Sequence, residues 1–126
     1  MKINAIDHIV MTVGSVDKTC AFYSQILGMD ITTFGNGRKA LSFGVQKFNL
    51  HQAGEERAPN AHVPMPGSID LCLITDTPIG EVAQHLRSVD VEIIKGPIKR
   101  AGAIGPIISL YLRDPDQNLI EISNYL

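Results

Sequence analysis

The sequence has little of what marks several classes of protein. Over its 126 residues the formal net charge is only −2, and charged residues make up 19% of the chain. No block of like charge concentrates a field on one segment, which argues against electrostatic binding of nucleic acid or of an anionic membrane. The expected partners are therefore a small-molecule substrate and further copies of the chain.

Long apolar runs and paired cysteine motifs are also missing. No stretch approaches the roughly 18 apolar residues of a membrane-spanning helix, and the N-terminal MKINAIDHIV lacks the uninterrupted apolar region of a signal peptide. We therefore expect a cytoplasmic protein. The two cysteines, Cys20 and Cys72, show no CxxC spacing, so we expect both to be free thiols, with Cys20 in the core and Cys72 as a small buried thiol.

The chain does contain two halves with the same order of local patterns. Its length is typical of a single domain. In the first half, a β-rich run at residues 3–13 precedes Ser15, a plausible N-cap for a helix over 16–27 that Gly28 closes. Alternating and β-branched residues then predict three short strands, at 29–34, 38–45 and 47–53.

A loop rich in proline and glycine, residues 54–67, precedes the second half. The order of strand, helix and three strands then repeats, at 68–75, 78–89, 91–98, 104–113 and 118–126. The doubled β-α-β-β-β order predicts an α+β fold. Two tandem modules, at about residues 1–55 and 67–126, are expected to form curved mixed sheets around a metal or ligand cavity within one domain.

Polar side chains occupy matched places in the apolar strands of the two modules. By element order, His8 in the first strand matches Asp70 in the fifth, and His51 in the fourth matches Glu121 in the eighth. Glu121 could simply face water, as is common on one side of an antiparallel sheet. Strand alternation instead places all four side chains on the face that the helices do not cover, which favours a common cavity.

Several stretches carry a resemblance to a known family. The doubled plan, the N-terminal IDHIVMTV, the helix end FYSQILGM and the C-terminal LRDPDQNLIEI resemble the vicinal oxygen chelate superfamily, also called the glyoxalase, bleomycin-resistance and extradiol dioxygenase fold. The resemblance covers nearly the whole chain. Within the superfamily, the chain is most similar to the glyoxalase-domain-containing branch that includes virulence-protein-like members.

The resemblance implies one divalent metal ion, of nickel, cobalt, manganese, iron or zinc, held by residues of the first, fourth, fifth and eighth strands. These positions correspond to His8, His51, Asp70 and Glu121, with Asp70 or Glu121 as the catalytic base. The chain departs from glyoxalase I, which commonly has an acid in the fourth strand and a histidine in the fifth. It also carries Gln117 where a glycine is common in the turn before the last strand.

The activity that the resemblance implies is that of a glyoxalase-type lyase or isomerase. Such an enzyme acts on a small substrate with adjacent oxygens through an enediolate-like intermediate. An extradiol ring-cleaving dioxygenase and a metal-free binding or resistance protein are the alternatives. We expect a homodimer, because the edges of a four-stranded sheet need cover. Four cations could contact an anionic substrate, although solvation at the surface is their expected role: Arg38, Lys95, Lys99 and Arg100.

Overall fold

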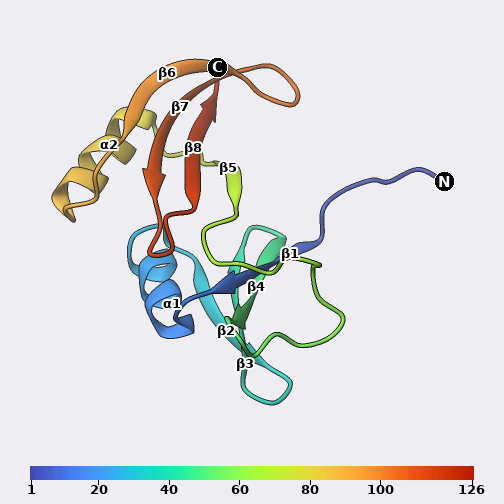
Figure 1. Ribbon diagram of the computed structural model, residues 1–126. Coiled ribbons are helices and arrows are strands. Elements are labelled where there is room, and N and C mark those ends of the chain that lie inside the picture. The colour runs from blue at the N-terminus through green and yellow to red at the C-terminus, as the bar shows by residue number, and fades with distance from the viewer. The chain divides into compact units, whose positions relative to one another are not determined.

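The computed structural model describes residues 1–126 and divides into two compact units (Figure 1). The N-terminal unit, Met1–Gly67, and the C-terminal unit, Ser68–Leu126, each have the predicted β-α-β-β-β order. The elements of the N-terminal unit are β1 (His8–Val13), α1 (Val16–Gln25), β2 (Asp30–Phe34), β3 (Arg38–Phe43) and β4 (Gln46–Gln52). Those of the C-terminal unit are β5 (Asp70–Ile74), α2 (Ile79–Ser88), β6 (Lys95–Ala101), β7 (Pro106–Arg113) and β8 (Leu119–Tyr125).

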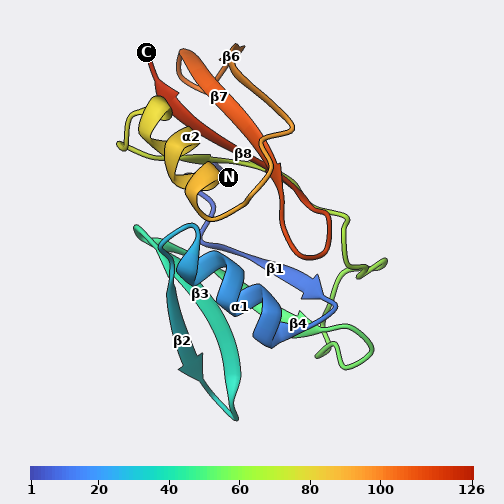
Figure 2. The same cartoon turned by 90° about the vertical axis from the view of Figure 1, so that its left-hand side faces the viewer.

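Each unit contains one four-stranded mixed sheet with the same topology. The strand orders are β1-β4-β3-β2 and β5-β8-β7-β6. In both sheets the first and last strands of the unit pair in parallel, and the remaining pairs are antiparallel. The helix of each unit covers one face of its own sheet (Figure 2). We call the opposite face the helix-free face.

The first helix begins and ends where the sequence predicts a cap and a breaker. The Ser15 hydroxyl accepts a hydrogen bond from the backbone N–H of Lys18 at 3.2 Å, which satisfies one of the free donors of the first turn. Gly28 has a φ of +70°, a conformation that favours glycine. The helix ends at Gln25, slightly before the predicted end.

Strand alternation separates an apolar core from a polar face in both units. In the N-terminal unit, Met11 and Val13 of β1 are fully buried, and the Phe48 ring lies 5.9 Å from that of Tyr23 on α1. In the C-terminal unit the buried apolar residues include Leu86, Leu110, Leu112, Ile120 and Ile122. The intervening residues of these strands therefore point to the helix-free faces.

The largest difference from the predicted elements lies before β7. The sequence predicts a strand at 91–98, whereas β6 runs from Lys95 to Ala101 and its pairing with β7 shifts register between Lys95 and Ile98. Gly96 lies at this irregularity with a φ of +96°, and a Cβ there would collide with the backbone carbonyl oxygen of Ser109. This close approach of the two backbones requires glycine, and regular pairing of β6 with β7 begins only after it.

Three smaller predictions concern the first strand, the two cysteines and the turn before β8. The strand expected to begin at residue 3 begins at His8. Both cysteines are free thiols; Cys20 is buried as predicted, whereas Cys72 is exposed, so its predicted burial is wrong. Gln117 has a φ of +68°, the backbone conformation for which a glycine is usual. None of the helices combines the length and apolarity needed to cross a bilayer.

Candidate metal and ligand site

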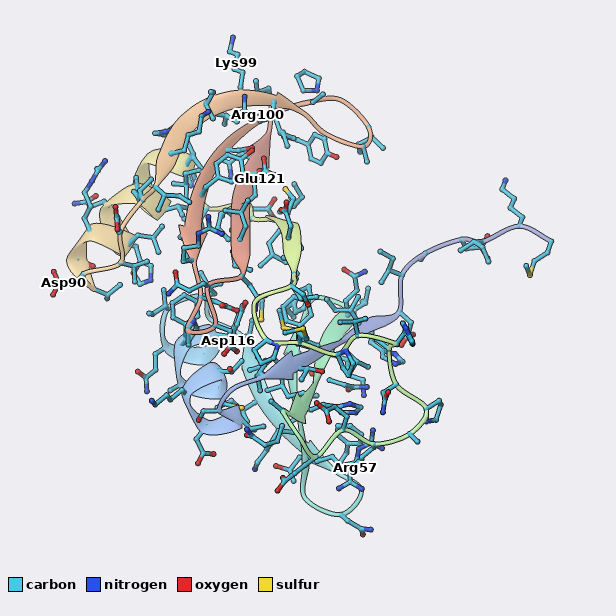
Figure 3. All side chains as sticks on the ribbon, in the orientation of Figure 1. Arg57, Asp90, Lys99, Arg100, Asp116 and Glu121 are labelled. Atoms are coloured by element: carbon cyan, nitrogen blue, oxygen red, sulfur yellow. The ribbon has the colours of Figure 1, made fainter.

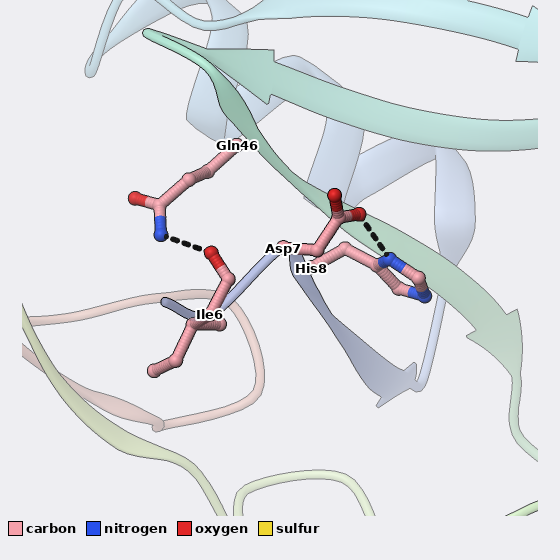
Figure 4. Close-up of polar contacts among 4 residues, drawn as sticks. All are labelled: Ile6, Asp7, His8 and Gln46. Carbon is pink, nitrogen blue, oxygen red and sulfur yellow. Dashed lines mark hydrogen bonds and ion pairs between the residues drawn. The ribbon is translucent and has the colours of Figure 1, made fainter. Parts of the chain in front are cut away.

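His8 is the first residue of β1 and lies on the helix-free face of the N-terminal sheet. Its Nδ1 atom lies 2.8 Å from Oδ1 of Asp7 (Figure 4). In the same segment, the Gln46 side chain donates a hydrogen bond to the carbonyl of Ile6 at 2.8 Å, which ties the start of β1 to β4. A carboxylate at Nδ1 favours the tautomer whose Nε2 lone pair is free. His8 is thus prepared to bind a cation through Nε2.

His51 lies in β4 and is only 7% exposed. It lines a cavity of about 270 Å³ together with Val10 and Thr12 of β1 and the loop residues Pro59, Asn60, Ala61 and Pro64. Its Nδ1 atom is buried without a hydrogen-bond partner. A buried polar atom without a partner is costly, so this ring nitrogen is a feature that the fold of the N-terminal unit alone does not explain.

The two histidines share a face but are far apart along their ladder. His8 pairs with Lys47, whereas His51 pairs with Thr12, four positions further along. At about 3.3 Å per residue, that separation is about 13 Å along the strands. Side chains stand roughly perpendicular to a sheet, so the two rings of one N-terminal unit do not converge on one point.

Asp70 and Glu121 are closer together in the C-terminal sheet. Asp70 pairs with Leu119, and Cys72 pairs with Glu121, so the two carboxylates are one strand and two ladder positions apart. Strand rise and strand spacing place their Cα atoms roughly 8 Å apart. Both line a cavity of about 460 Å³. The structure therefore brings these two predicted residues to one cavity of the C-terminal unit.

Glu121 is held by a chain of two hydrogen bonds. The Tyr111 hydroxyl donates to Oε1 of Glu121 at 2.9 Å, and Nε of Arg100 donates to the same hydroxyl at 3.1 Å. Desolvation raises the pKa of Tyr111, and Glu121 raises it further while Arg100 lowers it. Tyr111 therefore remains a neutral donor that orients the carboxylate.

Cys72 and two serines lie beside Glu121 on the helix-free face. The Cys72 thiol is 3.3 Å from the Ser123 hydroxyl, which in turn is 2.7 Å from the buried Ser109 hydroxyl. Burial raises the pKa of the Cys72 thiol, and the Glu121 charge adds to this effect. The thiol is consequently a poor nucleophile at neutral pH.

The ladders of the two units show which residues are truly equivalent. A side-chain amide at the end of each last strand binds the start of the helix: Gln52 Oε1 accepts from Val16 N–H at 3.1 Å, and Asn124 Oδ1 accepts from Ile79 N–H at 2.7 Å. Each amide also donates to backbone carbonyls of the segment between the first strand and the helix. Gln52 is therefore the counterpart of Asn124.

Counting back along the strands corrects one prediction about matched positions. The match of His8 with Asp70 is confirmed, because each opens its strand and the ladders agree from there. The match of His51 with Glu121 is wrong: Asn49 is the counterpart of Glu121, and His51 that of Ser123. The match by element order was wrong because it compares whole strands and not the position of each residue within the paired strands.

Asn49 is thus a residue of the helix-free face that the sequence reading missed. It is 7% exposed, and its Oδ1 atom is buried without a hydrogen-bond partner. An amide oxygen is one of the donor types that hard cations accept. The signal that could have found it is its spacing of three residues from Gln52, the same as that of Glu121 from Asn124.

Neither unit by itself groups three His, Cys, Asp or Glu side chains in positions to bind one metal ion. Each unit contributes two of the four predicted ligands to its own helix-free face. The N-terminal unit offers imidazoles and an amide oxygen, and the C-terminal unit offers carboxylates with a cationic surround. Imidazole nitrogens, amide oxygens and carboxylates are each donor types that divalent ions accept.

Comparison with known proteins defines the class of this fold. Residues 5–122 match the family model of the Glyoxalase/Bleomycin resistance protein/Dioxygenase superfamily. The chain belongs to this superfamily. Its fold agrees with that of a lactoylglutathione lyase from Agrobacterium tumefaciens, with a TM-score of 0.74 and 20% identity over 98% of this chain and 96% of that one.

Two relatives are much more similar in sequence. Virulence protein STM3117 of Salmonella typhimurium is 51% identical over 126 residues, which is 100% of this chain and 88% of that protein. Its crystal structure has a TM-score of 0.98 and is covered completely, as is this chain. Glyoxalase domain-containing protein RDO1 of Mycosarcoma maydis is 50% identical over 99% of this chain and 70% of its own length. Neither name states a reaction.

Proposed function

We propose that this protein is a divalent-metal-dependent enzyme of the glyoxalase type, a lyase or isomerase for a small substrate with adjacent oxygens. The observation that carries the proposal is the hydrogen bond between Asp7 and Nδ1 of His8, which leaves Nε2 free on the helix-free face. Acid–histidine pairs of this kind commonly accompany histidines that bind metals. His51, which lines the cavity of the N-terminal unit, would provide the second imidazole.

The ligands would be His8, His51 and Glu121, with Asp70 as a fourth ligand or as the base. A bound divalent ion would supply Lewis acidity that stabilises negative charge on two neighbouring substrate oxygens. Nickel, cobalt, manganese, iron and zinc all accept such a mixed nitrogen and oxygen set. The oxygens of the set include the Glu121 carboxylate, whose Oε1 atom is oriented by Tyr111.

Proton transfer would fall to the two carboxylates of the C-terminal unit. Asp70 and Glu121 line the same cavity, so either can take a proton from a substrate carbon and return it to the neighbouring carbon. The Tyr111 hydroxyl restrains Glu121, whereas Asp70 is exposed at the start of β5. Asp70 is therefore the more mobile of the two and our preferred base.

Metal uptake is the direct test of the proposal. Chelator-treated protein is loaded in turn with Ni²⁺, Co²⁺, Mn²⁺, Fe²⁺ and Zn²⁺, and bound metal is measured by elemental analysis; we expect about one ion per chain. His8→Ala, His51→Ala and Glu121→Ala should each weaken binding strongly, whereas His85→Ala, on the exposed side of α2, should not. Lowering the pH through the histidine range should release the ion. Failure to retain any metal would favour a metal-free binding protein.

A second experiment separates the roles of the carboxylates. Asp70→Asn keeps an oxygen of similar size but removes the base. On whichever substrate a screen of hemithioacetals, catechols and epoxides identifies, this variant should keep its metal and lose turnover. Full activity would leave Glu121 as the base, and oxygen uptake with a catechol would instead identify a ring-cleaving dioxygenase.

We also propose that the protein is a homodimer whose site takes its two imidazoles from different chains. Strands β1 and β2 are unpaired edges of one sheet, and β5 and β6 are those of the other. Val10 and Ile74, on the helix-free faces, are 44% and 51% exposed. Moreover, the separation of His8 from His51 along their ladder disfavours one ion held by both rings of one chain.

Mixing two inactive variants tests this arrangement. A dimer formed from one His8→Ala chain and one His51→Ala chain carries one intact pair of imidazoles only if the pair spans two chains. Metal binding should then return in the mixture after co-refolding, while each variant alone stays deficient. If light scattering shows the mixture to be dimeric and metal binding does not return, both imidazoles of a site come from one chain.

A further inference from the structure

The larger cavity of the C-terminal unit carries more positive charge than its two candidate catalytic carboxylates require. Its volume is about 460 Å³, and three of its lining residues are cations: Lys95, Arg100 and Arg113. The cavity is also lined by two carboxylates, Asp70 and Glu121. When all five groups are ionised, the three cations exceed the carboxylates by one positive charge. A cavity of this size suits a small organic molecule.

The cations do not neutralise the carboxylates directly. No ion pair joins any of the three to Asp70 or Glu121, although all five side chains line the same cavity. The Arg113 Nη1 atom donates to the backbone carbonyl of Gln117 at 3.2 Å, so this residue is tied to the turn before β8. The side chain of Lys95 is exposed at the start of β6. Donors capable of binding an anion are therefore left over.

Tyr111 explains why Arg100 stays apart from Glu121. Its hydroxyl lies between them, accepting from Nε of Arg100 and donating to Glu121, and the guanidinium carbon lies 5.8 Å from the centre of the Tyr111 ring. Only Nε is used in this contact, so both terminal nitrogens of Arg100 remain unpaired. Arg100 and Glu121 lie on the same side of the sheet, while the neighbouring Lys99 projects outward from β6 (Figure 3).

We propose that this cavity binds a carboxylate group of the substrate through the terminal nitrogens of Arg100 and the ammonium group of Lys95. A planar carboxylate matches the paired donors of a guanidinium, and its single negative charge equals the surplus of the cavity. The inference rests on the proposed function, because it makes the substrate a small organic acid whose reacting carbons lie toward Glu121 and Asp70. The substrate class is thus an acid with two adjacent oxygens close to its carboxylate.

Lactate, its neutral amide lactamide and inorganic phosphate serve as probes for the test. Each is titrated into the full-length protein, first with a chelator present and again after zinc loading, while the Nε–H signal of Arg100 is followed by NMR. We expect lactate to shift this signal and to bind about tenfold more tightly than lactamide, because only lactate supplies the charged acceptor. Equal binding of the two, or binding of phosphate alone, would overturn the inference.

Three matched variants complete the experiment. With binding measured by titration calorimetry, Arg100→Met and Lys95→Met should each weaken lactate binding about tenfold, whereas Lys99→Met, one residue away and facing outward, should change it by less than about twofold. Circular dichroism melting of each variant shows whether it is folded. Unchanged lactate binding by a folded Arg100→Met protein would refute the assignment. Metal uptake, measured on the same samples, reports on the proposed function separately, because Arg100 is not among the ligands.

Discussion

The two units share one backbone plan but treat their polar residues in opposite ways. In the C-terminal unit, Glu121 is hydrogen-bonded to Tyr111, and Ser123 to Ser109. At the equivalent positions of the N-terminal unit, Asn49 and His51 bury polar atoms that have no partner. The C-terminal face is thus organised in advance by its own side chains, while the N-terminal face contains groups that its own side chains leave unsatisfied.

The largest effect should come from removing the charge of Glu121. Glu121→Gln keeps the size of the side chain but weakens the proposed metal ligand, and we expect the affinity for Zn²⁺ to fall about 100-fold. Competition with a chromogenic chelator measures this affinity. The exposed Glu92, in the same unit, is the control position, since Glu92→Gln should leave binding unchanged. Equal affinities for the two variants would exclude Glu121 from the metal site.

Next in size is the difference between the two amides that bind the helices. Asn124→Ala should cost about 2 kcal/mol of unfolding free energy and Gln52→Ala about 1 kcal/mol. The reason is that the N-cap residue of α2, Pro78, makes no side-chain cap hydrogen bond, whereas α1 retains the Ser15 cap. Urea denaturation gives both values. A larger loss for Gln52→Ala would contradict the proposed division of roles.

A smaller contrast concerns the equivalent polar positions on the helix-free faces. Asn49→Leu removes an unpartnered buried oxygen and should change the unfolding free energy by less than about 1 kcal/mol, while Ser123→Ala leaves the Ser109 hydroxyl unpaired and should cost about 2 kcal/mol. If Asn49 serves a ligand, Asn49→Leu should lose metal or substrate affinity without losing stability. A marked destabilisation would show that Asn49 has a structural partner instead.

The smallest effect is on the reactivity of Cys72. Burial, the Glu121 charge and the hydrogen bond to Glu121 hold its pKa above the ordinary 9.0, against the lowering effect of Ser123. Alkylation by iodoacetamide should therefore be slow at neutral pH and accelerate only above pH 9. Glu121→Gln removes one of the raising influences, so its alkylation should accelerate at lower pH. Mass spectrometry distinguishes Cys72 from the buried Cys20, which serves as the internal control.

Much of the fold could be predicted because it follows from local chemistry. The Ser15 cap, the Gly28 end of α1 and the alternation around Met11 and Val13 depend on neighbours in the chain. The start of β6 could not, because the position of Gly96 is set by the distant carbonyl of Ser109. A local pattern does not encode such a close approach across strands.

The candidate site was predictable only in part for a similar reason. Matching elements placed His8 opposite Asp70 correctly, because both open their strands. The same matching overlooked Asn49, since identifying the counterpart of Glu121 requires the registers of the two ladders. The sequence named Arg100 and Lys95 among four cations that could contact an anion, but it could not single them out, because only the fold places them in one cavity with Tyr111.

The side-chain amides of Gln52 and Asn124, which bind the start of α1 and of α2, have a consequence for exchange of units between chains. Each amide makes its hydrogen bonds within its own unit, where it joins the last strand to the segment between the first strand and the helix. Exchanging a whole unit between two copies of the chain would therefore break none of these hydrogen bonds. Only the connection between β4 and β5, residues 53–69, would have to follow a new path, and the entropy of a connection depends only weakly on its length. The stability that these hydrogen bonds give to a unit is therefore the same whichever chain supplies the other unit.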